Sequence, residues 1–158
     1  MESAGERIET AFPGLRGKIW QLTSAATSRY NCLAWAAGDI SQWWWPCDPI
    51  EDYYWPAGVE HAETLAAFVS AYSLLGYAPC STPQAEPGYE KVALFAAADG
   101  IPTHASRQLP SGRWTSKLGE GEDIEHDLQD IGGAIYGSVV QLMRRPCSAA
   151  AAYSSPSS

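Results

Sequence analysis

Cysteine and histidine are the residue types in this chain that could together attack a carbonyl group. Cys32 follows Asn31, a favoured N-cap residue, and residues 33–37 are compatible with a helix, so Cys32 is expected at a helix start. Free backbone N–H groups at a helix start favour a thiolate, and an imidazole can take the thiol proton. His104 lies in a predicted strand and is the candidate base. The alternative is that Cys32 is a small buried side chain without a chemical role.

Three further polar side chains follow His104 on the next predicted strands. Ser116 lies across the turn at 110–112, so it can stand beside His104 and orient the ring. Lys117 points to the opposite face by strand alternation. It could bind a substrate carboxylate, or be a solvated residue that pairs with acidic neighbours in the run 120–127. His126 either lines the same cleft or packs at a sheet edge against a backbone carbonyl.

Tryptophan is unusually frequent, with seven residues in the chain. Three are consecutive at 43–45, and the loop 45–58 that follows is punctuated by prolines. Trp45 and Trp55 are candidates for a cleft wall. The alternative is that these rings seal the N-terminal helices against the sheet, since each can bury ~150–250 Å².

The elements that must position these residues are predicted in two groups. Apolar residues at helical spacing predict a helix over 59–75, which ends at Gly76. Strands are predicted at 91–97, 103–109, 113–118, 124–126 and 135–143, with turn signals between them. The first thirty residues are expected to form an arm that wraps the domain. Helices followed by an antiparallel meander indicate an α+β fold.

The length of 158 residues fits a single domain, predicted over 1–147, with an Ala/Ser-rich disordered tail at 148–158. The net charge of -8 argues against nucleic-acid and anionic-membrane partners. The absence of a long apolar run or a signal-peptide pattern favours a cytoplasmic protein with free thiols. No metal or other cofactor is expected. His61, Glu63 and Cys80 imitate a zinc deaminase signature, but Pro83 stands where its second cysteine should be.

Seven segments together carry a family resemblance over residues 12–146. They are 30–39 (YNCLAWAAGD), 43–46 (WWWP), 54–56 (YWP), 88–96 (GYEKVALFA), 103–107 (THASR), 114–119 (WTSKLG) and 123–126 (DIEH). The chain resembles the papain-like fold in its NlpC/P60 form, and more specifically a bacterial family of unknown function. The resemblance implies a nucleophile at Cys32, a base at His104 and an orienting group near Ser116. In NlpC/P60 proteins the cysteine usually follows an aspartate, where this chain has Asn31.

The function expected from residues and resemblance is a cysteine hydrolase or acyltransferase that acts on a peptide or amide substrate. The backbone N–H of Cys32 and the Asn31 side chain would bind the oxyanion. Two alternatives remain. One is a non-catalytic papain-like binding module with a tryptophan-rich cleft, and the other is a small effector or defence protein.

Overall fold

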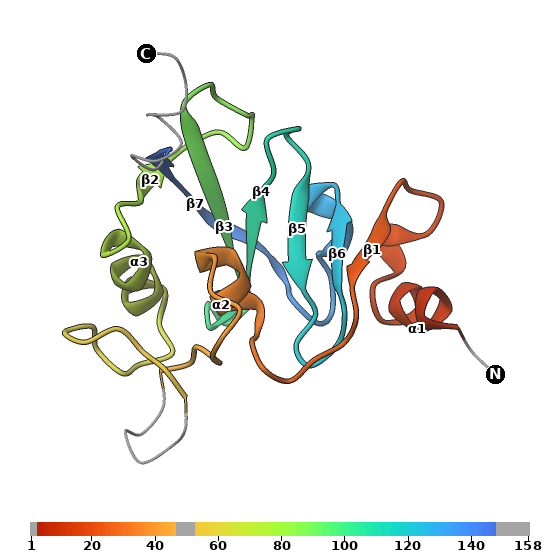
Figure 1. The fold of residues 1–158 in the computed structure, drawn as a ribbon, viewed down its shortest axis with the longest axis horizontal. Helices are drawn as coiled ribbons and strands as arrows, with labels where there is room; N and C mark the ends of the chain where they lie inside the picture. Colours follow the sequence, from red (N-terminus) through yellow and green to blue (C-terminus); the bar gives the residue numbers. More distant parts are fainter. Residues whose placement is uncertain (1–2, 47–52, 148–158) are drawn as a thin grey trace.

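A seven-stranded antiparallel sheet runs through the centre of the protein, in the order β1-β6-β5-β4-β3-β7-β2 (Figure 1). The computed structural model describes residues 3–46 and 53–147. The predicted tail therefore lies outside the described residues. The strands are β1 (Gln21–Ser24), β2 (Ala78–Cys80), β3 (Tyr89–Ala96), β4 (Pro102–Gln108), β5 (Trp114–Lys117), β6 (Asp123–His126) and β7 (Ser138–Pro146). The helices are α1 (Ala4–Ala11), α2 (Cys32–Ala37) and α3 (Leu65–Ser73), with 3-10 turns η1 (Pro13–Leu15) and η2 (Leu128–Ile131). The α+β class is confirmed.

The meander from β3 to β6 is confirmed, but the sheet does not continue from β6 into β7. Instead β7 returns to pair with β3 along its whole length, and β1 pairs with the free side of β6. The long β3–β7 ladder satisfies the backbone of β3, whose residues from Val92 onward are all buried. The edge strands β1 and β2 come from segments that carry no clear strand pattern, and the sequence did not predict them.

Two helix predictions need correction. The segment expected as an arm contains α1, which a capping box between Ser3 and Glu6 begins and the buried Ile8 anchors. The helix predicted over 59–75 is shorter, because Thr64 is its N-cap and accepts a hydrogen bond from the Ala67 N–H. None of the described helices is long and apolar enough to cross a membrane.

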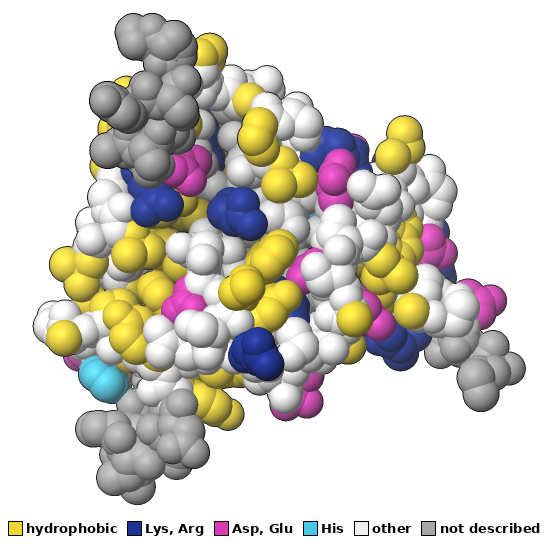
Figure 2. Space-filling model, in the orientation of Figure 1, with side chains coloured by type: hydrophobic (Ala, Val, Ile, Leu, Met, Phe, Trp, Pro, Cys, Tyr) yellow, Lys and Arg dark blue, Asp and Glu magenta, His cyan; other side chains and the backbone are white. Residues whose placement is uncertain are grey.

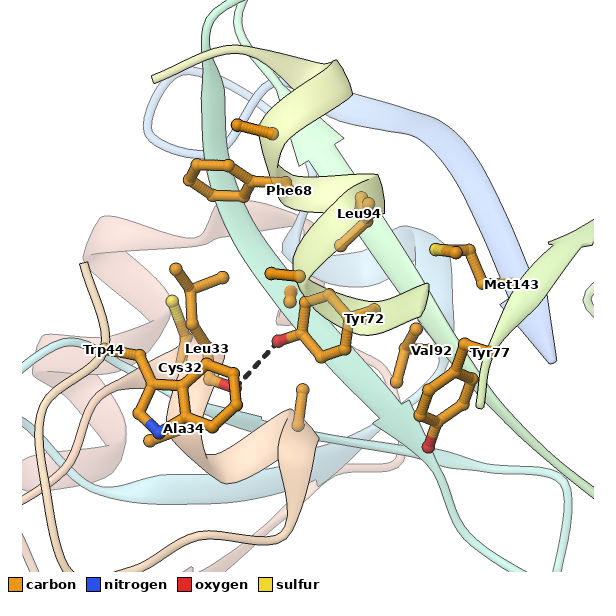
Figure 3. Close-up of a cluster of buried hydrophobic side chains, with 14 of the residues drawn as sticks. Cys32, Leu33, Ala34, Trp44, Phe68, Tyr72, Tyr77, Val92, Leu94 and Met143 are labelled. Carbon is orange, nitrogen blue, oxygen red and sulfur yellow. Dashed lines mark hydrogen bonds between the residues drawn. The ribbon is translucent and has the colours of Figure 1, made fainter. Parts of the chain in front are cut away.

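The core has two parts, one on each face of the sheet. Alternate residues of β3 point into each part: Val92 and Leu94 into the first, Ala93 and Phe95 into the second. The first part lies under α2 and α3, where the Tyr72 hydroxyl donates to the Leu33 carbonyl at 2.7 Å (Figure 3). The second contains residues of α1, η1 and η2. The helix α2 is thereby tied to α3 and held in place on the sheet.

The sheet is open between β4 and β5 near the predicted site. Only two residue pairs join these strands, Arg107 with Thr115 and Gln108 with Trp114. Toward the start of β4 and the end of β5 the strands make no ladder pairs, and the Ser116 side chain bridges this region through hydrogen bonds to Ser106 and His104. Adjacent residues of β4 face opposite sides of the sheet here, because Ala105 lies in the first part of the core and His104 packs on Phe95 of the second part.

Candidate functional site

Cys32 is the first residue of α2, as the sequence predicts. Asn31 is the N-cap, and its Oδ1 accepts hydrogen bonds from the Ala34 and Trp44 N–H groups. One N–H of its Nδ2 donates to the Trp44 carbonyl at 2.7 Å, and Asn31 lines the same pocket as Cys32, so the second N–H remains the expected donor for an oxyanion. Asn31 also fixes the start of α2 against the tryptophan loop.

The thiol of Cys32 is buried and is protonated in this structure's resting state. Burial raises its pKa to about 11, although backbone N–H groups of Ala105 and Leu33 and the charge of Lys117 act in the opposite direction. The expectation of a thiolate favoured by the helix start is therefore not met, because α2 is short and desolvation dominates. No hydrogen bond joins the sulfur to His104, whose Nδ1 is buried without a partner.

His104 lies on β4 and is fully buried beside the opening in the sheet. Its ring stacks on the Tyr136 ring, with centroids 3.8 Å apart. Tyr136 and Cys32 line the same pocket, and the Ala105 N–H that faces the sulfur belongs to the residue after His104. Burial, with a smaller effect of His126, holds the His104 pKa well below its usual value, so the ring is neutral at pH 7.

Ser116 lies beside His104, where the sequence places it. Its Oγ is 2.9 Å from His104 Nε2 and 2.7 Å from His126 Nε2. The Ser106 hydroxyl is 2.7 Å away on the same side. The structure thus joins two histidines through one serine.

His126 does not line the pocket, contrary to the functional interpretation of the sequence. It is fully buried on β6, which lies between β1 and β5, so it is not at a sheet edge either. Its Nδ1 is 2.8 Å from the Asp127 carbonyl. Burial lowers its pKa to about 4.

Lys117 is likewise absent from the pocket wall and is fully buried. Its ammonium donates to the carbonyls of Thr27 and Gly119 and lies over the Tyr30 ring. It therefore neither meets a substrate carboxylate nor points into solvent. Because Gly119 lines the pocket, Lys117 holds the pocket-lining segment after β5 in place.

The two tryptophans predicted to form a cleft wall, Trp45 and Trp55, lie in different environments. Trp45 lines the pocket beside Cys32, while Trp55 is buried in the core, packs on Phe68 and donates to the Glu60 carbonyl. Trp43 also lines the pocket and was not singled out by sequence. Trp44 forms an isolated β-bridge with Tyr54, so its backbone is extended. Side chains alternate along an extended segment, which puts residues 43 and 45 on the same side. This alternation is the sequence signal that could have identified Trp43 as a pocket residue together with Trp45.

The pocket at Cys32 has a volume of about 340 Å³ and is mainly aromatic. It is lined by Asn31, Cys32, Trp43, Trp45, Tyr53, Thr103, Gly119 and Tyr136. A polar pocket of about 360 Å³ shares Trp43 and Tyr53 with it and adds Ser28, Arg29, Ser41, Gln42 and Glu120. An apolar pocket of about 400 Å³ shares Gly119 and Tyr136 and adds Arg7, Ile8, Ala11, Phe12, Leu118, Gly121 and Ile135. We call these three adjoining pockets the groove.

The charges around these elements are mixed rather than of one sign. Figure 2 shows acidic and basic side chains interspersed on the face of the molecule seen in Figure 1. No group of three His, Cys, Asp or Glu side chains suited to a metal ion occurs among residues 3–46 and 53–147.

Comparison with known families gives one match. The model of the family described as a domain of unknown function (DUF7689) matches residues 21–144. The chain belongs to this family, and the match covers α2, α3, the strands β1 to β6, most of β7, and the residues Cys32, His104, Ser116 and His126. Neither the curated proteins nor the solved structures that were compared contain a match.

Proposed function

We propose that this member of the family is a thiol hydrolase or acyltransferase that acts on a peptide- or amide-type bond, on a papain-like fold of the NlpC/P60 kind. One observation carries the proposal. The buried Nδ1 of His104 has no hydrogen-bond partner, although buried ring nitrogens are normally paired. It belongs to a neutral ring that stacks on Tyr136, a wall of the pocket that contains Cys32.

The proposed reaction begins with both groups neutral. As the Cys32 sulfur attacks the substrate carbonyl carbon, its proton passes to His104 Nδ1, so the oxyanion and the imidazolium form together. The imidazolium then protonates the leaving amine while the carbon–nitrogen bond breaks. A thioester on Cys32 remains. Water or another amine attacks it, with His104 Nδ1 again taking the proton. The carbon–sulfur bond then breaks, and the Cys32 sulfur recovers the proton from His104, so that both groups are neutral again.

This order of events suits the pKa directions at the site. Burial raises the pKa of the Cys32 thiol and lowers that of His104, and both directions favour a neutral thiol and a neutral imidazole before substrate binds. Substrate must therefore bring the sulfur and the ring together. A backbone N–H at the start of α2 and the second N–H of the Asn31 amide are the candidate donors for the oxyanion, because one Asn31 N–H already donates to the Trp44 carbonyl.

The groove supports an extended substrate. The pocket that contains Cys32 shares lining residues with both the polar pocket and the apolar pocket, which share none with each other. A substrate that fills all three carries its reacting carbonyl in the middle, polar groups at one end and apolar groups at the other. A peptide meets this requirement, because successive side chains can differ in chemistry while amide carbonyls recur along the backbone.

We propose a reducing compartment and a substrate other than nucleic acid. Cys32, Cys80 and Cys147 are free thiols in the structure, which fits a reducing cytoplasm. The net charge of -8 disfavours nucleic acid as the substrate.

The decisive experiment is acylation of Cys32 by p-nitrophenyl acetate, measured by p-nitrophenolate release and by peptide mass mapping. Cys47, Cys80 and Cys147 are changed to serine in the background so that the acetyl group can be located; Cys47 lies outside the described residues. The reaction forms an acetyl thioester and releases p-nitrophenolate. We expect His104→Gln to slow acylation about 100-fold or more. The exposed His61 provides the control, and His61→Gln should leave the rate unchanged.

A non-catalytic binding module is the second candidate, and one observation favours it. The Cys32 thiol has a pKa of about 11 and no hydrogen bond to His104. If this candidate is right, Cys32 reacts no faster in the parent protein than in the His104→Gln variant. Ligand binding to the groove would then be unaffected by Cys32→Ala.

A further inference from the structure

The hydrogen-bond chain from Asp127 to His104 determines which ring nitrogen of His104 carries a proton. The Asp127 carbonyl can only accept, so His126 Nδ1, 2.8 Å away, must be the donor. His126 is neutral at pH 7 because burial lowers its pKa to about 4. Its Nε2 is therefore a bare acceptor.

The same logic passes through Ser116. The bare His126 Nε2 lies 2.7 Å from Ser116 Oγ, so the serine hydroxyl donates its single proton there. Ser116 Oγ can then only accept from its other neighbours. His104 Nε2, at 2.9 Å, must carry the proton that it donates to this oxygen. The Ser106 hydroxyl supplies a second donor at 2.7 Å, which uses the remaining lone pair.

We propose that His126 is a positioning residue which, through Ser116, fixes His104 in the tautomer with a protonated Nε2 and a bare Nδ1. The bare Nδ1 is the atom that the structure leaves without a partner. It is also the atom that must be bare if His104 is to accept a proton from Cys32. The catalytic consequence thus rests on the proposed function, whereas the tautomer does not.

This hydrogen-bond path differs from the arrangement in which a carboxylate orients a histidine. No ionised group takes part, because both rings are neutral and the two remaining members are a serine hydroxyl and a backbone carbonyl. Such a hydrogen-bond path orients the His104 ring and sets its tautomer without stabilising an imidazolium by charge. A low His104 pKa in the resting state is the expected accompaniment.

The test is two-bond proton–nitrogen NMR of the full chain labelled with nitrogen-15 in histidine, at pH 7. The chain has three histidines, so the spectrum is simple and His61→Gln assigns the surface residue. In the parent protein we expect His104 with a protonated Nε2 and a bare Nδ1, and His126 with the opposite pattern. A protonated Nδ1 on His104 would overturn the proposal.

Three variants test whether the hydrogen-bond path through His126, rather than its neighbours, sets the His104 tautomer. His126→Leu removes the acceptor for the Ser116 proton, so the Nδ1-protonated form of His104 should appear. His126→Gln keeps an amide acceptor and should restore the parent spectrum. Ser106→Ala changes a hydroxyl that bonds the same Ser116 oxygen but lies off the path, and it should leave the tautomer unchanged.

Two outcomes beyond the parent spectrum decide the matter. If His126→Leu folds and keeps His104 wholly Nε2-protonated, the proposal is wrong. If His126→Leu does not fold, Ser116→Ala provides the same test, because it removes the oxygen that accepts from His104. Acylation measured on the same variants reports separately on the proposed function. If His104 keeps a fixed tautomer but Cys32 does not react, the proposed enzymatic activity is wrong and the proposed hydrogen-bond path from Asp127 to His104 stands.

Discussion

The His104 ring lies face to face on the Tyr136 ring, with centroids 3.8 Å apart and planes inclined by 13°. Phe95 meets the same imidazole edge-on at 5.3 Å. Tyr136 also lines the Cys32 pocket, so one ring both holds the candidate base and forms the wall against which a substrate would lie. The stack limits rotation of His104 about the axis that the Ser116 hydrogen bond defines.

This relationship predicts different effects for two substitutions at one position. Tyr136→Phe keeps the ring and should leave Cys32 acylation nearly unchanged. Tyr136→Leu removes the flat surface, and we expect acylation to fall about tenfold or more because His104 is no longer held in one orientation. The measurement is p-nitrophenolate release, with thermal unfolding as a check on the fold. Equal rates for the two variants would show that the stack has no role in the chemistry.

A second prediction concerns stability at acidic pH. The His126 pKa is about 4 in the folded protein and 6.5 is the ordinary value, so the unfolded chain binds the proton first as pH falls. The free energy of unfolding contributed by this group is complete above about pH 6.5 and is lost progressively down to pH 4. This difference between the two pKa values corresponds to about 3 kcal/mol.

Urea unfolding of the parent and His126→Gln between pH 7 and pH 4 measures this loss. Carboxylates that titrate in the same range affect both proteins and cancel in the difference. We expect the variant to lose less stability than the parent as the solution is acidified. Parallel pH dependences for parent and His126→Gln would mean that His126 is already protonated, or exposed, in the folded state.

The sequence predicted the parts of this site that depend on local patterns. Asn31 is a good cap before helix-compatible residues, and the hairpin turns at 99–100 and 110–112 place Ser116 near His104. The next hairpin pairs Trp114 with His126 and Ser116 with Ile124, which puts His126 diagonal to Ser116 on one face. That register depends on the conformation of residues 118–122, which residue types alone leave open, so the sequence did not decide between the cleft and a sheet edge for His126.

The remaining differences arise from contacts between distant segments. The burial of Lys117 depends on the Thr27 carbonyl, ninety residues earlier in the chain. The place of β7 beside β3 depends on which strand completes the ladder of β3, and Trp55 is buried because α3 presents Phe68 to it. Periodicity identifies strands and helices, but it does not say which distant carbonyl or ring each side chain will meet.

The groove predicts that binding at the apolar pocket requires Ile135, which is 49% exposed and lines that pocket. In a Cys32→Ala background, a blocked hexapeptide with three leucines and three polar residues should bind more tightly than an all-polar one. Ile135→Asp should weaken binding of the leucine peptide about tenfold. Leu74→Asp, at an exposed position outside the groove, is the control and should have no effect. Titration by tryptophan fluorescence measures the affinities, and indistinguishable affinities for the two peptides would contradict the assignment.

The last prediction concerns Gly137, which follows Tyr136 and has a φ of 76°. A Cβ at this position would lie 2.0 Å from the Ala96 carbonyl oxygen, where β3 ends, so backbone must move to admit it. Gly137→Ala should lower the free energy of unfolding by roughly 3 kcal/mol or more, through strain and displacement together. Gly100→Ala is the matched control, because Gly100 has a φ of 86° but its Cβ would meet nothing within 4 Å.

The Gly100→Ala control measures the cost of the left-handed backbone conformation without the collision of the added Cβ. Gly100→Ala should cost about 1–2 kcal/mol from the left-handed conformation alone. If Gly137→Ala shifts Tyr136 as the collision requires, the His104 ring loses its stacking partner. Acylation of Cys32 should then fall in Gly137→Ala at temperatures where that variant remains folded, and stay at the parent rate in Gly100→Ala. Chemical denaturation and p-nitrophenolate release on the same two proteins check both effects, and equal destabilisation by the two substitutions would show that the turn at Gly137 can relax away from β3.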